Sequence, residues 1–494
     1  MADVVRDLPT ALAAANWQTT VLTPAYGMLH LLPDANSIAS VEVEFRGATE
    51  TVDVFDVPGT EAQVRNVVFE HPCFSPNGPG QVYCSDPDGR PFATDANKFA
   101  FFSATAAAWI NELQEMPDVV HLHDWHAALY AVLRAGSPKL DRLRDVRTVF
   151  TIHNLAYQGT RPLRGDPSSL EAWFPNLEYD TAQVRDPVFA DCVNPMAAAI
   201  RLADKISTVS PSYAEEICKP SDLETGFFGG EGLEGELQAA QRDNRLVGIL
   251  NGCFYNGPKG RRPGWQRFIK IASEQVDSWA ADGANKQAHN ISQQRLQSLP
   301  KRRPQNVLTS IGRLVQQKAS LFFEPTADGR STLDVILDNL DSKSVLILLG
   351  SGEDWLEQKM LEVAERRGNL LFLCGYSETL ADPLYRMGDL FLMPSSFEPC
   401  GISQMLAMRA AQPCIVHGVG GLKDTVTHNR SGFVFAGDTP AAQASEFIKT
   451  VAHALDTKIN SNDDWQTICI RAASARFSWP KSAQQTIELL YENN

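Results

Sequence analysis

The sequence predicts an α/β protein with two doubly wound, Rossmann-like domains whose sheets face a common cleft. Short apolar runs alternate with helical patterns in the first half of the chain, and a second series of the same kind begins at 307–311. Polar or glycine-rich residues follow the strands of both series. This alternation is typical of parallel sheets, in which ligands bind beyond the carboxyl ends of the strands. Two such sheets therefore predict one ligand-binding cleft.

The first series opens with a helical pattern over 1–15 and a strand pattern over 19–23. Alternating apolar and polar residues over 40–56 predict a strand pair. A stretch rich in Pro, Gly and Asp over 73–92 predicts a long loop. Two further helices are expected at 98–113 and 124–135, and four strands at 119–123, 147–153, 206–209 and 246–250.

The residues over 253–304 include prolines, glycines and basic pairs, followed by helical sequence, and we interpret them as a connection between the domains. The second series of apolar runs predicts five strands, at 307–311, 345–349, 370–373, 390–393 and 414–416. The chain ends in a helical apolar pattern that follows Pro480.

The composition excludes several classes of protein. A chain of 494 residues exceeds what a single core usually supports, so two or more domains are expected. Lys and Arg total 44 against 59 Asp and Glu, and this net charge of −15 argues against nucleic acid or an anionic membrane as a partner. No apolar run is long enough to span a bilayer, and the first residues lack a signal pattern. Nine scattered cysteines without CxxC spacing favour reduced, cytoplasmic thiols over disulfides or zinc.

The stretch 393–426 contains two strand-loop-helix units in tandem. Glu398 lies in the first loop, and a glycine-rich turn at 418–421 follows the second strand. Helix N-termini and such turns suit a phosphate group, and a carboxylate in this loop would face the ligand. Taken alone, however, the motif favours the simpler interpretation, in which Glu398 caps a helix and the glycines only form a turn.

Two cations, Arg313 and Lys318, follow the strand at 307–311 with a spacing of five residues. They could converge on one diphosphate, with Arg as a planar fork and Lys as a point charge. Two solvated surface cations are an equal alternative. His153 also ends a strand, where its imidazole either faces a ligand or lies in the core bonded to backbone.

Three histidines, His121, His123 and His126, flank Asp124 and Trp125. No acidic cluster accompanies them at ligand spacing, so we expect no metal site. Asp124 and Trp125 are better candidates for sugar contacts, through hydrogen bonds and ring stacking. Cys400 has no dedicated base nearby in sequence, which favours a ligand-facing thiol over a nucleophile.

Taken together, these motifs resemble those of bacterial glycogen synthases and plant starch synthases, retaining glycosyltransferases of the two-domain GT-B fold. The matching stretches run in the family's order across nearly the whole chain. They are HLHDWH (121–126), VFTIHNLAYQG (149–159), STVSPSYAEEI (207–217), GGEGLEGEL (229–237), GILNG (248–252), Arg313 with Lys318, GYSE (375–378), FEPCGISQ (397–404), GGLKDTV (420–426) and FSWPKSA (477–483). Leu406 stands where other GT-B enzymes have the second Glu of an E-x7-E pattern, which supports this family over its relatives.

The resemblance implies transfer of glucose from ADP-glucose, or from UDP-glucose, to the non-reducing end of an α-1,4-glucan. Configuration would be retained, without a metal or cofactor. Arg313 and Lys318 would neutralise the diphosphate, and Glu398 would hold the glucosyl unit and its developing positive charge. The other implied contacts are His153 with the glucose, Asp124 and Asn251 at the reacting centre, Tyr376 near the nucleoside, and Cys400, Gly401, Ile402 and Ser403 around glucose and phosphate.

The resemblance also implies that the segment 477–494 crosses back to the N-terminal domain. The expected organisation is then an acceptor-side domain at 1–252, a connection at 253–304 and a nucleotide-sugar-binding domain at 305–476.

Some positions depart from the family pattern. In the family a Lys-x-Gly-Gly loop directly precedes the Ala-Asp-Val that here is Ala2-Asp3-Val4, and we include Asp3 among the substrate-binding residues. We expect this chain to lack the strand and phosphate loop that precede these residues in the family, through a start placed too late or a truncation. Such a loss predicts unpaired edges on neighbouring strands and poor expression or low synthase activity. Ala319 replaces a usual Gly, and Cys253 stands where an acidic residue is usual.

Three functions stay open at this point. The first is a glucan synthase, and the second is a GT-B transferase that builds a different glucoside on a small acceptor. The third is a non-catalytic or catalytically impaired protein that binds glucan or nucleotide sugar.

Overall fold

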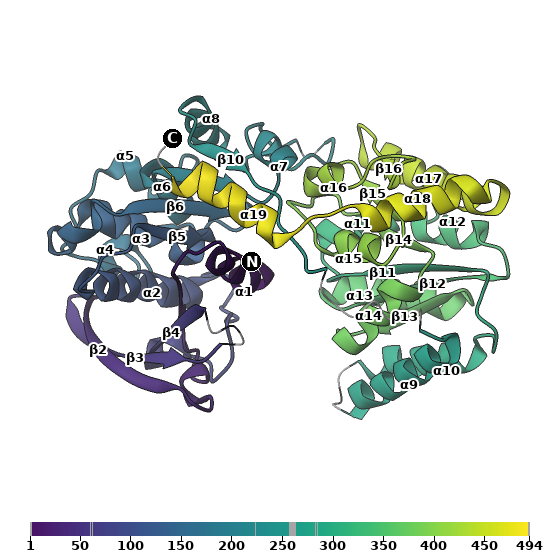
Figure 1. Ribbon diagram of the computed structural model, residues 1–494, viewed down its shortest axis with the longest axis horizontal. Helices are drawn as coiled ribbons and strands as arrows, with labels where there is room; N and C mark the ends of the chain where they lie inside the picture. The colour runs from purple at the N-terminus through teal and green to yellow at the C-terminus, as the bar shows by residue number, and fades with distance from the viewer. Residues whose placement is uncertain are drawn as a thin grey trace. The chain divides into compact units, whose positions relative to one another are not determined.

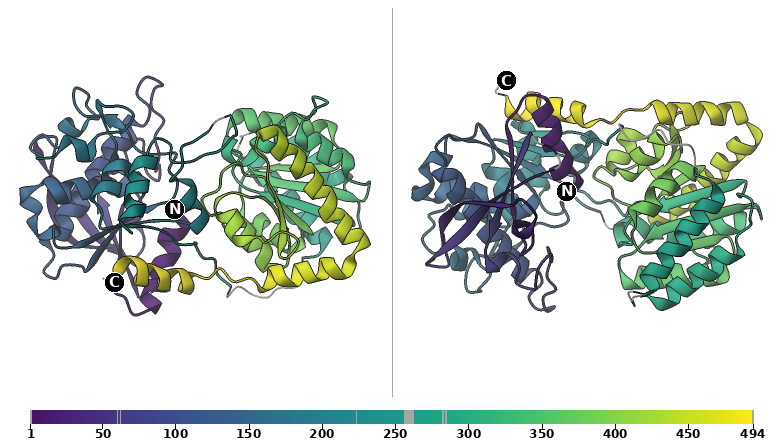
Figure 2. Two further views of the ribbon diagram at one scale, coloured as in Figure 1. Left: turned by 90° about the horizontal axis from the view of Figure 1, so that it is seen from above. Right: turned by 60° about the horizontal axis from the view of Figure 1, so that its bottom comes forward.

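The computed structural model divides the chain into two compact units (Figures 1 and 2). It describes all residues except 1, 60, 62, 223, 256–262, 282, 284, 493 and 494. Unit 1 comprises 1–221, 229–251 and 479–494, and unit 2 comprises 222–228 and 252–478. Within the described part of the chain, the helices are too short or too polar to cross a bilayer. All nine cysteines are free thiols.

Unit 1 contains two separate four-stranded sheets. The first has the order β1-β4-β3-β2, in which β1 and β4 are parallel and the other pairs are antiparallel. The second has the order β10-β9-β6-β5 and is entirely parallel. The strands of both sheets are β1 (Thr19–Pro24), β2 (Asn36–Phe45), β3 (Ala48–Val57), β4 (Val64–Glu70), β5 (Val119–His123), β6 (Arg147–Ile152), β9 (Lys205–Thr208) and β10 (Leu246–Gly248). The strand pair predicted at 40–56 is the antiparallel pair β2–β3, which confirms that expectation.

Helices and one short strand pair complete unit 1. The helices are α1 (Ala2–Ala14), α2 (Ala93–Glu112), α3 (Asp124–Gly136), α4 (Leu170–Trp173), α5 (Thr181–Val184), α6 (Pro195–Leu202), α7 (Pro211–Glu216), α8 (Glu234–Arg242) and α19 (Trp479–Thr486). Shorter pieces are η1 (Leu29–Leu31), η2 (Pro72–Phe74), η3 (Pro138–Leu143), η4 (Ile487–Tyr491), β7 (Arg161–Pro162) and β8 (Cys192–Val193).

The segment that begins at Trp479 packs within unit 1. Trp479, Ala483 and Ile487 form one buried apolar cluster with Val4 and Leu8 of α1. Accordingly α1 and α19 lie side by side (Figure 2). The helix α19 and the residue that follows it, Ile487, are thus held against α1 by burial of apolar surface.

Unit 2 contains one continuous parallel sheet of six strands. Its order is β13-β12-β11-β14-β15-β16, which is the doubly wound order 3-2-1-4-5-6 when the strands are counted within the unit. The strands are β11 (Asn306–Ile311), β12 (Ser344–Gly350), β13 (Leu370–Cys374), β14 (Leu390–Met393), β15 (Cys414–His417) and β16 (Gly432–Phe435). The order reverses between β11 and β14, where a ligand crevice is expected in such folds.

Apolar side chains cover both faces of this sheet in two separate clusters. The helices are α9 (Trp265–Ala281), α10 (Lys286–Ser298), α11 (Gln316–Phe323), α12 (Thr332–Asn339), α13 (Asp354–Arg366), α14 (Glu378–Met387), α15 (Ser403–Arg409), α16 (Gly420–Thr425), α17 (Pro440–Asn460) and α18 (Asn462–Ser474). The segment 253–304, which we interpret from sequence as a connection, contains α9 and α10. These two helices lie side by side in unit 2 (Figure 1), and Trp265 and Phe268 join one of its clusters.

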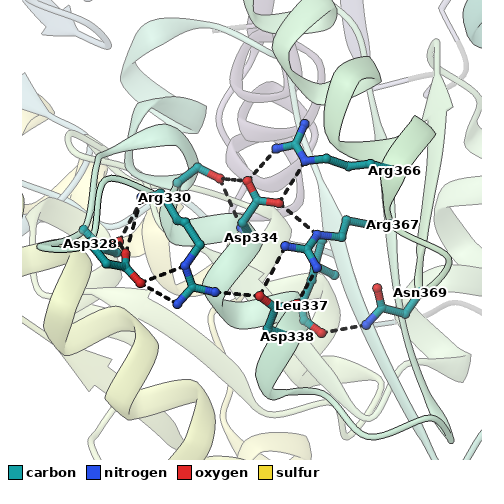
Figure 3. Close-up of polar contacts among 10 residues, drawn as sticks. Asp328, Arg330, Asp334, Leu337, Asp338, Arg366, Arg367 and Asn369 are labelled. Carbon is teal, nitrogen blue, oxygen red and sulfur yellow. Dashed lines mark hydrogen bonds and ion pairs between the residues drawn. The ribbon is translucent and has the colours of Figure 1, made fainter.

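An ion-pair network joins α12 to the end of α13 (Figure 3). Asp334 pairs with Arg366 at 2.5 Å and with Arg367 at 2.9 Å. Arg330 binds Asp338 at 2.6 Å, and Arg367 also contacts Asp338. Although burial alone would raise the pKa of Asp334, hydrogen bonds led by that of Arg366 lower it to about 2. The network therefore connects α12 with the C-terminal end of α13 in unit 2.

Candidate functional site

In unit 2, the beginning of α11 is tied to the loop after β14. Lys318 Nζ lies 3.2 Å from Glu398 Oε2, and the Ser395 hydroxyl donates to the same oxygen at 3.2 Å. Gln317 adds a second contact between α11 and this loop, because its side chain donates to the Phe397 carbonyl at 2.7 Å. The two strands concerned, β11 and β14, flank the reversal of strand order, so the pair lies where the fold favours a ligand.

Glu398 is only 6% exposed, and its carboxylate is held by Lys318 and Ser395. The helix-capping interpretation of this residue is therefore not what the structure shows. A buried carboxylate needs such partners, since an uncompensated charge would be costly to bury. An ammonium and a carboxylate held together in this way are a prepared set of charges for a polar ligand.

Arg313 is exposed in the loop between β11 and α11. A Cβ added to the residue before it, Gly312, would make an ordinary contact of 3.8 Å with Lys318 Cδ. Arg313, in the loop after β11, and Lys318, in the first turn of α11, therefore both follow the same strand of the sheet. Tyr376, which follows β13, has an exposed ring.

The residues from Cys400 to Ser403 lead into α15 and lie against the beginning of α16. A Cβ on Gly421 would meet Cys400 Cα at 2.5 Å, so the two segments touch through their backbones. Gly401 has φ +72°, a conformation that glycine adopts without strain. The Cys400 side chain is buried, and Gly401, Ile402 and Ser403 are half-buried.

In unit 1, the ends of β5 and β6 bring Asp124 and His153 together. The Asp124 carboxylate accepts hydrogen bonds from the backbone N–H of His153 at 2.7 Å and of Asn154 at 3.4 Å. Burial raises the pKa of Asp124 to about 6, although these two bonds oppose the shift. Asp124 also has φ +54°, an unusual backbone conformation for a residue other than glycine.

Beside Asp124, the Trp125 ring is buried. A Cβ on Gly159 would lie 2.5 Å from this ring, and the Phe99 ring meets it edge-on at 5.2 Å. Protein atoms therefore cover the indole on these sides, and its stacking on a sugar stays a prediction. Of the other expected contacts in unit 1, Asn251 is half-buried and Asp3 pairs with Arg6 at 3.0 Å.

Three imidazoles form a buried polar group next to this position. His123 Nδ1 and His153 Nε2 share a hydrogen bond of 3.0 Å, and the rings of His121 and His123 stack at 4.4 Å. Burial lowers the pKa of His123 to about 4, and burial together with the neighbouring imidazoles lowers the pKa of His121 and His153 well below the usual value. All three are therefore neutral near pH 7. Among the described residues, no cluster of three His, Cys, Asp or Glu side chains could hold a metal ion.

Sequence patterns missed several partners in these sites. Ser395 and Gln317 lie inside or beside the predicted motifs, but nothing in their residue types indicated contacts with the loop of Glu398. Tyr491, whose hydroxyl lies 2.8 Å from His121 Nδ1, is 370 residues away along the chain. A tertiary contact of this kind leaves no local signal in the sequence.

Comparison with known proteins supports one class. Residues 1–239 match the family model described as starch synthase catalytic domain, and 305–453 match glycosyl transferases group 1. A glycogen synthase of Anaeromyxobacter is 33% identical over 100% of this chain and 95% of that protein, and one of Gloeobacter violaceus is 32% identical over 99% and 94%. The catalytic domain of starch synthase IV from Arabidopsis thaliana, bound to ADP and acarbose, superposes with a TM-score of 0.74 at 26% identity, covering 99% and 94%.

The doubly wound sheet of unit 2, the parallel sheet of unit 1 and these likenesses define a glycosyltransferase with the GT-B fold. More narrowly, the chain belongs to the glycogen and starch synthase family.

Proposed function

We propose that the protein is a glycogen synthase that transfers glucose from ADP-glucose to the non-reducing end of an α-1,4-glucan with retention of configuration. The observation that carries the proposal is the Lys318–Glu398 pair at the reversal of strand order in unit 2, in a chain related to glycogen synthases over its whole length. The Arabidopsis neighbour with bound ADP supports an adenine nucleotide as the donor.

Departure of the diphosphate leaves negative charge that the enzyme must stabilise. In this proposal Lys318 and Arg313 supply the positive charge that stabilises the departing diphosphate. Both belong to the loop and helix that follow β11. Fixed charges aimed at the group that develops charge are commonly the largest contribution to catalysis. Glu398, already 3.2 Å from Lys318, would hold the glucosyl unit as it becomes positive.

The other expected contacts are part of the same proposal. In the domain at 1–252, His153 would contact the glucose, Asp124 and Asn251 would lie at the reacting centre, and Trp125 and Asp3 would bind substrate. The protein would act in the cytoplasm. The donor side would be formed in the domain at 305–476 by Tyr376, Cys400, Gly401, Ile402 and Ser403, without a metal.

The test measures incorporation of labelled glucose into glycogen from ADP-glucose and, in parallel, from UDP-glucose. Lys318→Ala is expected to lower kcat by about 100-fold or more, by analogy with the loss of one charge-stabilising group in other active sites. Lys449→Ala is the matched control, because Lys449 forms an exposed pair with Glu446 at 2.7 Å elsewhere in unit 2. Equal activities of the two variants would refute the assigned role of Lys318. Absence of glucosyl transfer by the parent protein would refute the proposed function itself.

A further inference from the structure

Two exposed aromatic rings lie against each other in unit 1. Phe92 is 52% exposed and Tyr157 is 58% exposed, although large aromatic side chains are usually buried on average. Their ring centroids are 6.5 Å apart and their planes meet at 78°. This pair offers two apolar faces to solvent at a steep angle.

The backbone at Phe92 breaks two local rules. Phe92 has φ +60° and ψ 14°, a left-handed conformation in which a bulky side chain is a genuine outlier. It is also the N-cap of α2 and makes no capping hydrogen bond, at a position that favours Ser, Thr, Asp, Asn or Gly. Strain of this kind clusters at functional sites, where surrounding contacts hold the unfavourable conformation.

Such contacts are present on both sides of Phe92. Arg161 Nη1 donates to the carbonyl of Pro91 at 2.7 Å, and the N–H of Ala96 donates to the carbonyl of Phe92 at 2.8 Å. Asp86 accepts from both the N–H and the hydroxyl of Thr94. The chain is therefore fixed before and after the ring, while the ring itself stays in solvent.

Tyr157 is held in a similar way. It lies four residues after His153, in the loop whose next glycine, Gly159, packs on the Trp125 ring. The N–H of Leu155 donates to the Tyr213 hydroxyl at 3.1 Å, and the side chain of Gln158 donates to the carbonyl of Glu231 at 3.0 Å. An exposed ring on a fixed loop binds with a small loss of conformational entropy.

We propose that Phe92 and Tyr157 form a stacking platform for the acceptor, a linear α-1,4-glucan, beside the position of Asp124 and His153. This inference rests on the proposed function and names a subsite for its acceptor. Sugar rings present apolar C–H faces that pack on aromatic rings. Two rings whose planes meet at 78° cannot both stack on a flat glucan chain such as a β-1,4 chain. The α-1,4 linkage turns successive glucose units with respect to each other, so each ring could stack on a different unit.

The test uses binding of maltoheptaose, measured by calorimetry on the full chain without nucleotide sugar. Phe92→Gly and Tyr157→Ala are each expected to weaken binding by about tenfold, equivalent to about 1.4 kcal/mol. Tyr157→Phe keeps the ring and is expected to bind like the parent. Cellohexaose, whose β-1,4 chain is flat, should bind the parent weakly.

Tyr179→Ala is the matched control. Tyr179 is also an exposed aromatic of unit 1. The residue before it packs on Gly136 at the C-terminal end of α3, whereas Asp124 begins that helix, so Tyr179 lies at the opposite end of the helix from the proposed platform. Its maltoheptaose affinity should equal that of the parent.

Phe92→Gly also separates binding from folding. Glycine accepts φ +60° without a Cβ clash, so this variant should have a Tm at or above that of the parent. Weaker binding by a protein that melts at the same or a higher temperature supports the platform. Unchanged affinity of both Phe92→Gly and Tyr157→Ala, or a change of oligomeric state in place of affinity, overturns it.

The outcome is distinguishable from failure of the proposed function. A parent that binds maltoheptaose through these rings but transfers no glucose leaves the platform standing and removes the synthase. A parent that transfers glucose while both ring variants keep their KM for glucan leaves the synthase standing and removes the platform.

Discussion

The two units arrange their parallel strands differently. Unit 2 gathers six strands into one sheet, and every residue of β11 and β12 is buried. Unit 1 distributes its strands over two sheets, and the outermost strands β1 and β5 are mostly half-exposed. A strand that is paired on both edges and covered on both faces is shielded from water, whereas an edge strand keeps a row of backbone groups on one side. Local opening should therefore be easier in unit 1 than in unit 2.

Acidification should widen this difference most. Unit 1 holds four imidazoles whose pKa is lowered, chiefly by burial: to about 4 for His123, to about 3 for His126, and well below the usual value for His121 and His153. An unfolded histidine binds a proton near pH 6.5, so the unfolded unit binds more protons between that value and the lowered pKa. Stability of unit 1 therefore falls as the pH falls below about 6.5.

Other titrating groups change how far acidification separates the stabilities of the two units. Asp124, with its pKa raised to about 6, binds its proton more readily when folded and so opposes one histidine between about pH 6 and 4. In unit 2, Asp334 stabilises the fold above about pH 4 and loses this contribution only as the pH falls toward 2. Burial also lowers the pKa of His417 in unit 2.

The expected loss in unit 1 is several kcal/mol between pH 7 and pH 5, at about 1.4 kcal/mol per pH unit for each histidine. Limited proteolysis with peptide mapping at the two pH values reports each unit separately. His123→Asn, which removes one titrating ring, should reduce the pH dependence. If unit 2 is cleaved first on acidification, the buried histidines are not the sensitive groups.

A matched pair of core truncations tests the role of the sheets. Val345 of β12 is buried in an apolar cluster, whereas Val21 of β1 is half-exposed. Val345→Ala removes the same atoms as Val21→Ala but leaves a cavity, so we expect costs of about 2–3 kcal/mol and less than about 1 kcal/mol respectively. Urea unfolding followed unit by unit provides the measurement. Equal costs would mean that β1 is as well covered as β12.

The sequence predicted unit 2 better than unit 1 for a physical reason. Runs such as Val345–Leu349 consist of apolar residues because both faces of the strand are covered, and such runs are visible without a structure. The stretch at 19–23 contains three threonines and indicates a strand, but its burial depends on which strands pair with it. Pairing is a property of the tertiary structure, and a single strand pattern does not record it.

In the candidate site, too, local sequence patterns predicted some features and tertiary structure was needed for others. Arg313 and Lys318 both follow β11, as the strand pattern indicated, and their convergence on one diphosphate stays a prediction. The contact between Lys318 and Glu398 spans 80 residues and needed the fold, although the family motifs implied that both act together. The steep aromatic pair of Phe92 and Tyr157 had no sequence signal, since the exposure of a ring and a left-handed backbone are features of the folded chain.

If unit 2 proves more stable than unit 1, its ion-pair network is a competing explanation, and this is the smallest effect that we predict. Arg330 is about half-exposed in its side chain and bridges Asp328 and Asp338 at 2.6 Å each. Exposed pairs of this kind contribute little, because water and salt screen them and ordering the side chains costs entropy. Arg330→Met should therefore lower the free energy of unfolding of unit 2 by less than Val345→Ala does at low salt, and by still less at about 1 M salt.

The size of this loss separates the two explanations. A loss comparable to that of Val345→Ala, or one that persists at high salt, would assign much of the stability of unit 2 to its surface charges. A small, salt-sensitive loss leaves the continuous sheet as the cause, because the buried strands are unchanged in this variant. Urea unfolding at two salt concentrations distinguishes the cases, with Lys449→Ala as a control for removal of an exposed ion pair outside the network.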